Sequence, residues 1–185
     1  SFSPQPRLMV DQNVLPPLAG EQYELGVKAK AFEGHLLLTG AVYQIVQQNF
    51  AAFDRNLNGI DYYRPVGEVK HRGFELKALG EIGDGFQINA GFAFPDAKVV
   101  KDTNASAIGQ RVLYLPENSF SAFMTYTIGQ GALSGLTIGG GVRYVDGVRT
   151  SYTGATIDIP AYTIVDASLT YDIGPWALQL NVQNL

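Results

Sequence analysis

The chain lacks cysteine altogether and has only two histidines, His35 and His71, among its 185 residues. The absence of cysteine excludes a disulfide scaffold, a thiolate metal site and a thiolate nucleophile. Two histidines are too few for a His-based metal cluster, and neither lies in a motif that would place it in a Ser-His-Asp set. We therefore expect no enzyme activity.

Charged residues are scarce. They make up 16% of the chain, with a net charge of −4, whereas an ordinary soluble domain has ~25%. Because 46% of the residues are apolar and 11% aromatic, the composition excludes disorder. The 13 basic residues are spread along the chain, which argues against nucleic acid as a partner. A soluble β-protein and a membrane protein both fit this composition.

Long apolar runs are also missing. The longest window without a charged residue, 118–142, is rich in Gly, Ser, Thr and Gln, whereas a spanning helix needs ~20 mostly apolar residues. The first residues show no basic region followed by an apolar one, as a signal peptide would. The chain stops directly after an alternating run, at Asn184 and Leu185, so we expect it to be a fragment of a longer protein.

What the sequence does contain is an alternation of apolar and polar residues, repeated along the chain. The alternating segments are 23–29, 37–45, 74–78, 86–94, 120–126, 136–144, 165–171 and 176–182. Such alternation predicts strands with one apolar and one polar face. We predict an all-β fold, an antiparallel up-and-down meander of about eight strands.

The connections between these segments alternate in length. Short turns are expected at 33–34, 83–85, 129–135 and 172–175, and long polar connections at 47–67, 97–118 and 146–160. Outer-membrane barrels have this asymmetry, with short periplasmic turns and long extracellular loops. The alternative is a soluble β-sandwich whose apolar face is its core, although sandwich strands are usually nearer 5–6 residues long.

The aromatic residues of the alternating segments fall into two groups. On the predicted outward face, one group lies near the short turns (Phe86, Tyr126, Tyr171, Trp176) and the other near the opposite rim (Tyr23, Tyr43, Phe94, Tyr144). Two such belts are expected at the two membrane–water interfaces. The opposite face is predicted to line a lumen and to carry Glu75, Lys77, Arg143 and Asp166. These charges would form a ladder of ion pairs or, alternatively, contact a ligand directly.

Several stretches resemble one family. Glu21–Lys28 reads E-x-Y-E-x-G-x-K, Gly67–Glu75 reads G-E-V-x-x-R-G-x-E, and Asn181–Leu185 reads N-x-x-N-L. These motifs, in this order, resemble those of TonB-dependent outer-membrane siderophore receptors, with the ferrichrome, hydroxamate and pyoverdine types most similar. Residues 41–45, 141–145 and 159–167 also follow the family's order.

The resemblance implies a 22-stranded barrel with a plug inside it, a size class of outer-membrane transporters. Residues 1–185 would be a partial barrel domain near the C-terminal end, without the plug, the early strands and the final hairpin. It further implies a receptor in the outer membrane of a Gram-negative bacterium, contacting membrane lipid and lipopolysaccharide. The intact protein would take up ferric siderophores with energy from the TonB complex, acting through the missing plug.

The same resemblance implies no catalysis and no covalently bound cofactor, with iron entering only as part of the ferric siderophore. An outer-membrane hydrolase is an unsupported alternative. The main alternative is a complete small eight-stranded outer-membrane barrel with a structural or adhesive role. An eight-stranded lumen would have to be filled by side chains, and the sequence is short of large charged networks for that purpose.

Aromatic and arginine side chains gather in the long connections. They would hold a bulky iron chelate by stacking and by charge-assisted hydrogen bonds; loop packing or contact with lipopolysaccharide is the alternative. The ligand-binding candidates are Phe50, Phe53, Tyr62, Tyr63, Arg64, Arg111, Tyr114, Arg149 and Tyr152.

One loop carries half of a calcium motif. Asp54, Asn56 and Asn58 offer oxygens at positions 1, 3 and 5, and Gly59 stands at position 6, as in an EF-hand loop. Position 12 is Pro65 where a bidentate Glu is needed. The segment is therefore a weak calcium candidate, and a solvated Asx-rich turn is the favoured interpretation.

Overall fold

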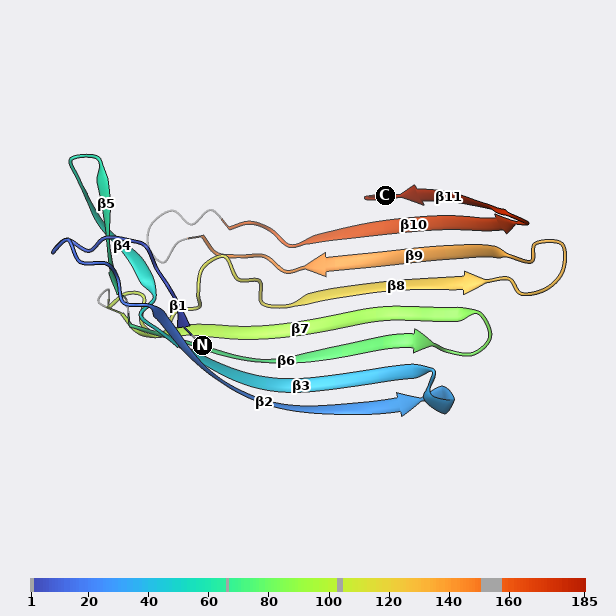
Figure 1. The fold of residues 1–185 in the computed structure, drawn as a ribbon, viewed down its shortest axis with the longest axis horizontal. Helices are drawn as coiled ribbons and strands as arrows, with labels where there is room; N and C mark the ends of the chain where they lie inside the picture. The colour runs from blue at the N-terminus through green and yellow to red at the C-terminus, as the bar shows by residue number, and fades with distance from the viewer. Residues whose placement is uncertain (1, 66, 103–104, 151–157) are drawn as a thin grey trace.

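The computed structural model describes residues 2–65, 67–102, 105–150 and 158–185. They form one curved antiparallel sheet of nine strands in the order β1-β2-β3-β6-β7-β8-β9-β10-β11 and a separate two-stranded hairpin, β4-β5 (Figure 1). The strands of the sheet are β1 (Phe2–Ser3), β2 (Leu18–Ala31), β3 (Leu36–Gln48), β6 (Glu68–Glu81), β7 (Phe86–Lys101), β8 (Ser119–Thr127), β9 (Leu136–Val145), β10 (Tyr162–Ile173) and β11 (Trp176–Val182). The predicted meander of eight long strands is confirmed.

The predicted long connections contain more structure than expected. The connection 47–67 holds the hairpin of β4 (Ala51–Leu57) and β5 (Ile60–Pro65), and β7 continues to Lys101 by pairing with β6. At the loop end of β6 and β7 the contrast between the two faces reverses, because Val69 and Val99 lie on the face that is polar elsewhere, whereas Lys70 and Lys98 lie on the other face. The backbone ladder nevertheless continues there, so the strands are longer than their alternating segments.

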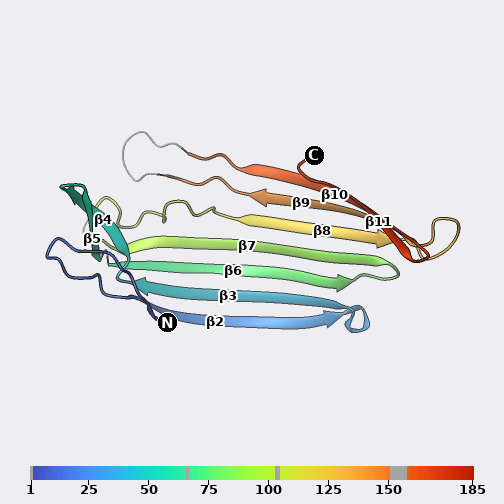
Figure 2. The same cartoon turned by 45° about the horizontal axis from the view of Figure 1, so that its top comes forward.

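The short and long connections lie at opposite ends of the sheet (Figure 2). At one end, called the turn end, are the 3₁₀ turn Phe32–Gly34 and the turns 82–85, 128–135 and 174–175. At the other, called the loop end, are the hairpin and the described parts of the connections 102–118 and 146–161 (Figure 1). No helix among the described residues is long and apolar enough to cross a membrane.

The register assigns each side chain to one of two faces, because directly paired residues point to the same side of a sheet. Leu25, Val42, Phe74 and Phe94 form one continuous row across four strands. This row belongs to the apolar face, whose side chains are open: Leu25 is 75% exposed. The other sheet of the described residues is the two-stranded hairpin β4-β5, and the open apolar face is that of a barrel wall, as predicted, rather than one layer of a soluble sandwich.

One aromatic residue lies on the opposite face from the one predicted. Tyr43 pairs with Glu24 and Gly73, which places it on the polar face, whereas the other predicted belt residues lie on the apolar face. The cause lies in β3, which has apolar residues at both alternate positions, beginning with Leu36, Leu37 and Leu38. The apolar–polar pattern of β3 therefore could not predict which face each of its residues occupies.

The sheet is open. One edge is formed by β2, of which the two-residue β1 covers only Leu18 and Ala19, and the opposite edge by β11 (Figures 1 and 2). The two edges are not paired with each other in the described residues. The complete eight-stranded barrel considered above would need that pairing to close. This structure is therefore a wall with two edges rather than a closed barrel.

The packing of Tyr43 generates a prediction about stability. A Cβ on Gly73 would lie 2.6 Å from both the Tyr43 hydroxyl oxygen and the Phe94 carbonyl oxygen, whereas at Gly91, on the same face of the neighbouring strand, the nearest atom would be 3.9 Å away. We expect Gly73→Ala to destabilise the intact protein by about 1–3 kcal/mol, a typical cost of overpacking, and Gly91→Ala to change stability little. Urea unfolding followed by gel mobility checks this, and equal effects would contradict the packing.

Candidate functional site

The loop end has a small packed core of its own. The segment 109–112 pairs with β7: the Gly109 amide donates to the Val99 carbonyl (2.8 Å) and the Val112 amide to the Ala97 carbonyl (2.9 Å). This pairing buries Val99 together with Val69 and Ala107. The loops at this end are thus supported by main-chain hydrogen bonds and apolar contacts, as a binding surface on a rigid scaffold requires.

The hairpin is attached to the N-terminal segment through Tyr63. The Tyr63 amide donates to the Leu8 carbonyl at 2.8 Å, and the Arg7 guanidinium lies 4.5 Å from the centre of the Tyr63 ring. The Tyr63 ring also meets Phe53 edge-on, with centroids 6.2 Å apart. The structure therefore brings the predicted Phe53 and Tyr63 together with an arginine that was not predicted.

The remaining candidates of the hairpin region are arranged differently. Phe50 is partly exposed and lines a pocket of about 340 Å³ with Gln5 and Leu18. Tyr62 pairs across the hairpin with Arg55. Arg64 has a buried Nε without a hydrogen-bond partner in the described part of the structure. These side chains lie in one region but do not converge on a single point.

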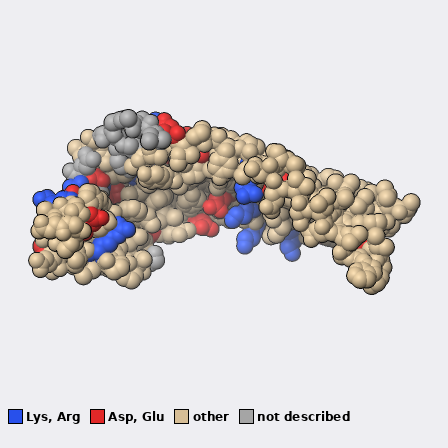
Figure 3. Space-filling view, turned by 90° about the horizontal axis from the view of Figure 1, so that it is seen from above, with Lys and Arg blue, Asp and Glu red and all other residues tan. Residues whose placement is uncertain are grey.

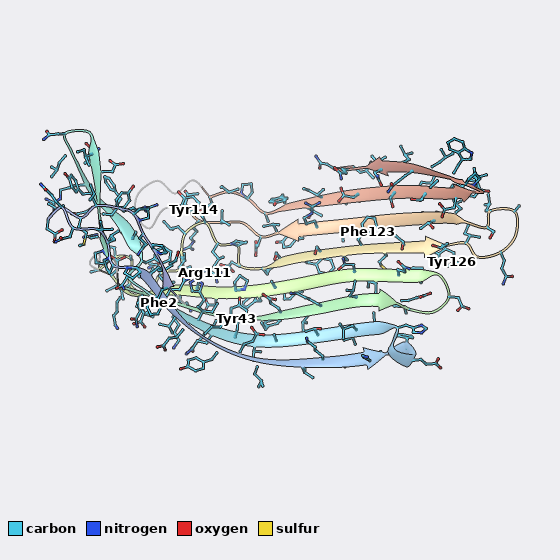
Figure 4. All side chains as sticks on the ribbon, in the orientation of Figure 1. Phe2, Tyr43, Arg111, Tyr114, Phe123 and Tyr126 are labelled. Carbon is cyan, nitrogen blue, oxygen red and sulfur yellow. The ribbon has the colours of Figure 1, made fainter. Side chains whose placement is uncertain are left out.

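Arg111 is held by protein groups. It contacts Asp96 at 3.5 Å and Glu117 at 3.6 Å and donates to the Pro95 carbonyl at 3.1 Å, with 22% of its side chain exposed. Two carboxylates thus already neutralise this cation, which is labelled at the loop end in Figure 4. Arg111 is therefore a structural tie between its loop and β7.

Tyr114 is the most exposed of the predicted aromatic residues for which the structure gives a position. It is 67% exposed and projects at the loop end (Figure 4). Its amide donates to the Arg149 carbonyl at 2.9 Å, so two of the three long connections meet here. Tyr152 lies outside the described residues.

The four charges expected on the lumen side lie on the polar face and form pairs. Lys77 contacts Glu75 at 3.3 Å within β6, and Arg143 of β9 contacts Asp166 of β10 at 3.3 Å. In Figure 3, charged side chains gather in the hollow between the two ends of the molecule. The pairing supplies the contacts that a ladder of ion pairs needs; direct ligand contact stays a hypothesis.

The calcium candidate forms the tip of the β4–β5 hairpin. The side-chain nitrogen of Asn56 donates to the Asp61 carboxylate at 2.6 Å, and its side-chain oxygen accepts from the Gly59 backbone amide at 3.0 Å. Asp54 forms an ion pair with Arg55 at 3.2 Å. Both functional groups of Asn56 therefore stabilise the turn. No group of three or more acidic or histidine side chains suited to a metal occurs in the described ranges.

Sequence reasoning missed the contribution of the N-terminal segment. The Gln5 side chain donates to the carbonyls of Asn49 (2.7 Å) and Pro16 (2.9 Å), and the Asn49 side chain donates to the Pro17 carbonyl (3.0 Å). The segment 4–17 has no alternation to mark it as ordered, and its partners are distant in sequence. The only sequence feature that could have indicated an ordered backbone in this segment is its high proline content.

Fold and faces together define a class. An antiparallel wall of long strands, with an open apolar face between two aromatic rows, a polar opposite face, short turns at one end and long loops at the other, is a segment of a transmembrane β-barrel.

Comparison with known proteins identifies the family. The family model described as "TonB dependent receptor-like, beta-barrel" matches residues 2–185. The chain belongs to this family, as the sequence motifs predicted.

Relatives match along the whole segment. The ferrioxamine B receptor of Salmonella typhimurium is 37% identical over 100% of this chain and 26% of its own length. The ferrichrome outer membrane transporter/phage receptor of Escherichia coli is 31% identical over 94% of this chain and 22% of its own. The solved ferripyoverdine receptor of the Pseudomonas aeruginosa outer membrane has a TM-score of 0.80 at 25% identity, covering 100% of this chain and 26% of that one. The chain thus spans about a quarter of these relatives.

The attachment of the hairpin generates a second prediction. Arg7→Gln removes the cation from the Tyr63 ring, an interaction of ~0.5–1 kcal/mol at an exposed site. We therefore expect hairpin amides to exchange with solvent about two- to fivefold faster, measured by hydrogen–deuterium exchange on the intact protein. Arg55→Gln is the matched control, because the Arg55 side chain forms its ion pair within the hairpin, with its sequence neighbour Asp54. Equal exchange in both variants would show that Arg7 does not fasten the hairpin.

Proposed function

We propose that the intact protein is a receptor in the outer membrane of a Gram-negative bacterium that binds ferric siderophores and takes them up with energy from TonB. The observation that carries this proposal is the 37% identity to the ferrioxamine B receptor over the whole segment. The similarity to a ferrichrome transporter and to a ferripyoverdine receptor supports the same class of ligand. Iron would enter as part of the chelate, with no covalent chemistry and no resident cofactor.

In this proposal residues 1–185 are one part of a larger barrel domain. The open edges, one along β2 beyond its two residues paired with β1 and the other at β11, would pair with further strands, since an unpaired edge leaves backbone groups unsatisfied within a membrane. A plug inside the barrel, outside this segment, would make the contact with the TonB complex. The apolar face would contact membrane lipid and the polar face would line the lumen.

The loop end is the proposed ligand surface. Tyr114 and Phe53 are open to solvent and offer ring faces on which an iron chelate would stack. Arg149 lies beside Tyr114 and would donate charge-assisted hydrogen bonds to chelate oxygens. Arg111, already neutralised by two carboxylates, would support the surface instead of binding the chelate.

The third prediction tests this surface. We expect Tyr114→Ala in the intact receptor to raise the Kd for a ferric hydroxamate siderophore about tenfold, the loss typical of a well-placed aromatic contact. Phe32→Ala is the control, because Phe32 is also exposed but lies at the turn end. Binding is measured with radioactive iron on purified receptor and uptake on cells.

Two outcomes would count against the proposal. An unchanged Kd in Tyr114→Ala would remove Tyr114 from the ligand surface. A wild-type receptor that binds none of a panel of ferric siderophores would reject the proposed function itself.

A further inference from the structure

The tip of the β4–β5 hairpin holds Asn58 and Gly59, the one Asn-Gly pair in the sequence. Both residues have positive φ, 53° at Asn58 and 83° at Gly59, and together they form the two-residue connection between Leu57 and its partner Ile60. A hairpin turn of this type needs positive φ at both central positions, so Asn-Gly is strongly favoured there. The fold of the hairpin therefore places this pair at an exposed tip.

An Asn-Gly pair carries a reaction of its own. The Gly59 main-chain nitrogen attacks the Asn58 side-chain carbonyl carbon; the new C–N bond closes a succinimide ring, while the bond to Nδ2 breaks. Nδ2 leaves as ammonia with the proton released from the Gly59 nitrogen. Water then adds to one ring carbonyl and breaks its bond to the nitrogen. Addition at the former side-chain carbonyl leaves aspartate, and addition at the main-chain carbonyl leaves isoaspartate, in which the main chain runs through the side-chain carbon.

The reacting groups are open to water. Asn58 and Gly59 are exposed, and a Cβ placed on Gly59 would have no atom within 4 Å apart from its chain neighbours. The Asn58 side chain forms no hydrogen bond or ion pair with the residues that the structure describes. It can therefore rotate toward the Gly59 nitrogen, and water can reach the ring that forms.

Two neighbouring side chains restrain the attacking nitrogen. The Gly59 amide donates to the side-chain oxygen of Asn56 at 3.0 Å, and the side-chain nitrogen of Asn56 donates to the Asp61 carboxylate at 2.6 Å. Asp61 thereby orients the Asn56 side chain so that its oxygen faces Gly59. Because a hydrogen-bonded amide keeps its proton and its position, these two bonds slow the attack on Asn58.

We propose that Asn58 is a site of spontaneous deamidation and that Asn56, oriented by Asp61, sets its rate. The inference concerns the chain's own chemistry and goes beyond the proposed ligand uptake. The aspartate product keeps the turn, since Asp-Gly also favours it. The isoaspartate product adds a methylene group to the main chain and disrupts the two-residue turn, so the hairpin that carries Phe53 loosens as the protein ages.

The experiment follows the intact protein, purified in detergent and incubated at neutral pH. Peptides taken at intervals are analysed by mass spectrometry for replacement of the side-chain NH₂ by OH, with fragmentation that separates isoaspartate from aspartate. Both products are expected to accumulate at Asn58. The internal control is Asn118, which precedes Ser119 of β8 and donates to Asp146 at 2.8 Å, and it is expected to stay unmodified.

Variants test the two hydrogen bonds. Asn56→Ala is expected to accelerate the reaction about fivefold, the factor that one hydrogen bond of ordinary strength contributes, and Asp61→Ala is expected to accelerate it as well. Asn56→Asp/Asp61→Asn exchanges the two groups and keeps both hydrogen bonds, so its rate is expected to match wild type. Arg55→Gln removes an ion pair of the same strand and is expected to leave the rate unchanged. Heat-dependent gel mobility checks that each variant is folded.

Hydrogen–deuterium exchange on aged protein tests the consequence for the hairpin. Molecules with isoaspartate at position 58 are expected to exchange their hairpin amides several-fold faster than unmodified molecules, because the turn no longer closes the ladder. Asn58→Asp has the charge of the product without the added methylene group and is expected to exchange like wild type.

Each contrary result overturns a stated part of the proposal. Asn58 left intact while a synthetic peptide of residues 52–64 is fully converted, or equal modification of Asn118, rejects the site. Unchanged rates in Asn56→Ala and Asp61→Ala, or the same acceleration in Arg55→Gln, reject control by the two hydrogen bonds. Equal exchange in modified and unmodified molecules rejects the loosening of the hairpin.

Discussion

The pairing of backbone amides and carbonyls between neighbouring strands is the constraint on which this structure depends. In hydrocarbon no water replaces a missing partner, so every strand must be paired along its membrane-crossing length. The register that satisfies this condition is continuous from β2 to β11. Because the register also fixes the face of every side chain, the division into an apolar and a polar face follows from the same hydrogen bonds.

Where the ladder leaves the apolar region, the chain satisfies its backbone in other ways. The segment 109–112 continues the pairing of β7. The Gln5 side chain donates to the Pro16 and Asn49 carbonyls, and the Asn49 side chain donates to the Pro17 carbonyl. The loop end is consequently an ordered surface with side chains held at defined positions. That order fixes the positions of the exposed rings, as the proposed binding surface without a deep cavity requires.

The sequence was sufficient to predict the strands, in which apolar and polar residues alternate with a period of two. The eight strands, the opposite placement of short and long connections and the family were all predicted from it. The face of Tyr43 was predicted wrongly, because β3 is apolar at both alternate positions and only its partners Glu24 and Gly73 determine its orientation. The contact of Arg7 with Tyr63 depends on two segments far apart in sequence, and no local pattern indicates it.

The same strands carry different chemistry on their two faces at the loop end. On β6 and β7, Val69 and Val99 point inward to support the loops, while Lys70 and Lys98, one residue away from each on its strand, point outward. Since neighbouring residues of a strand face opposite sides, substitutions at Lys70 and Lys98 change the outer surface without entering the packed core beneath the loops. The outer surface and the loop-end surface are thus physically separable, although one β-ladder positions both.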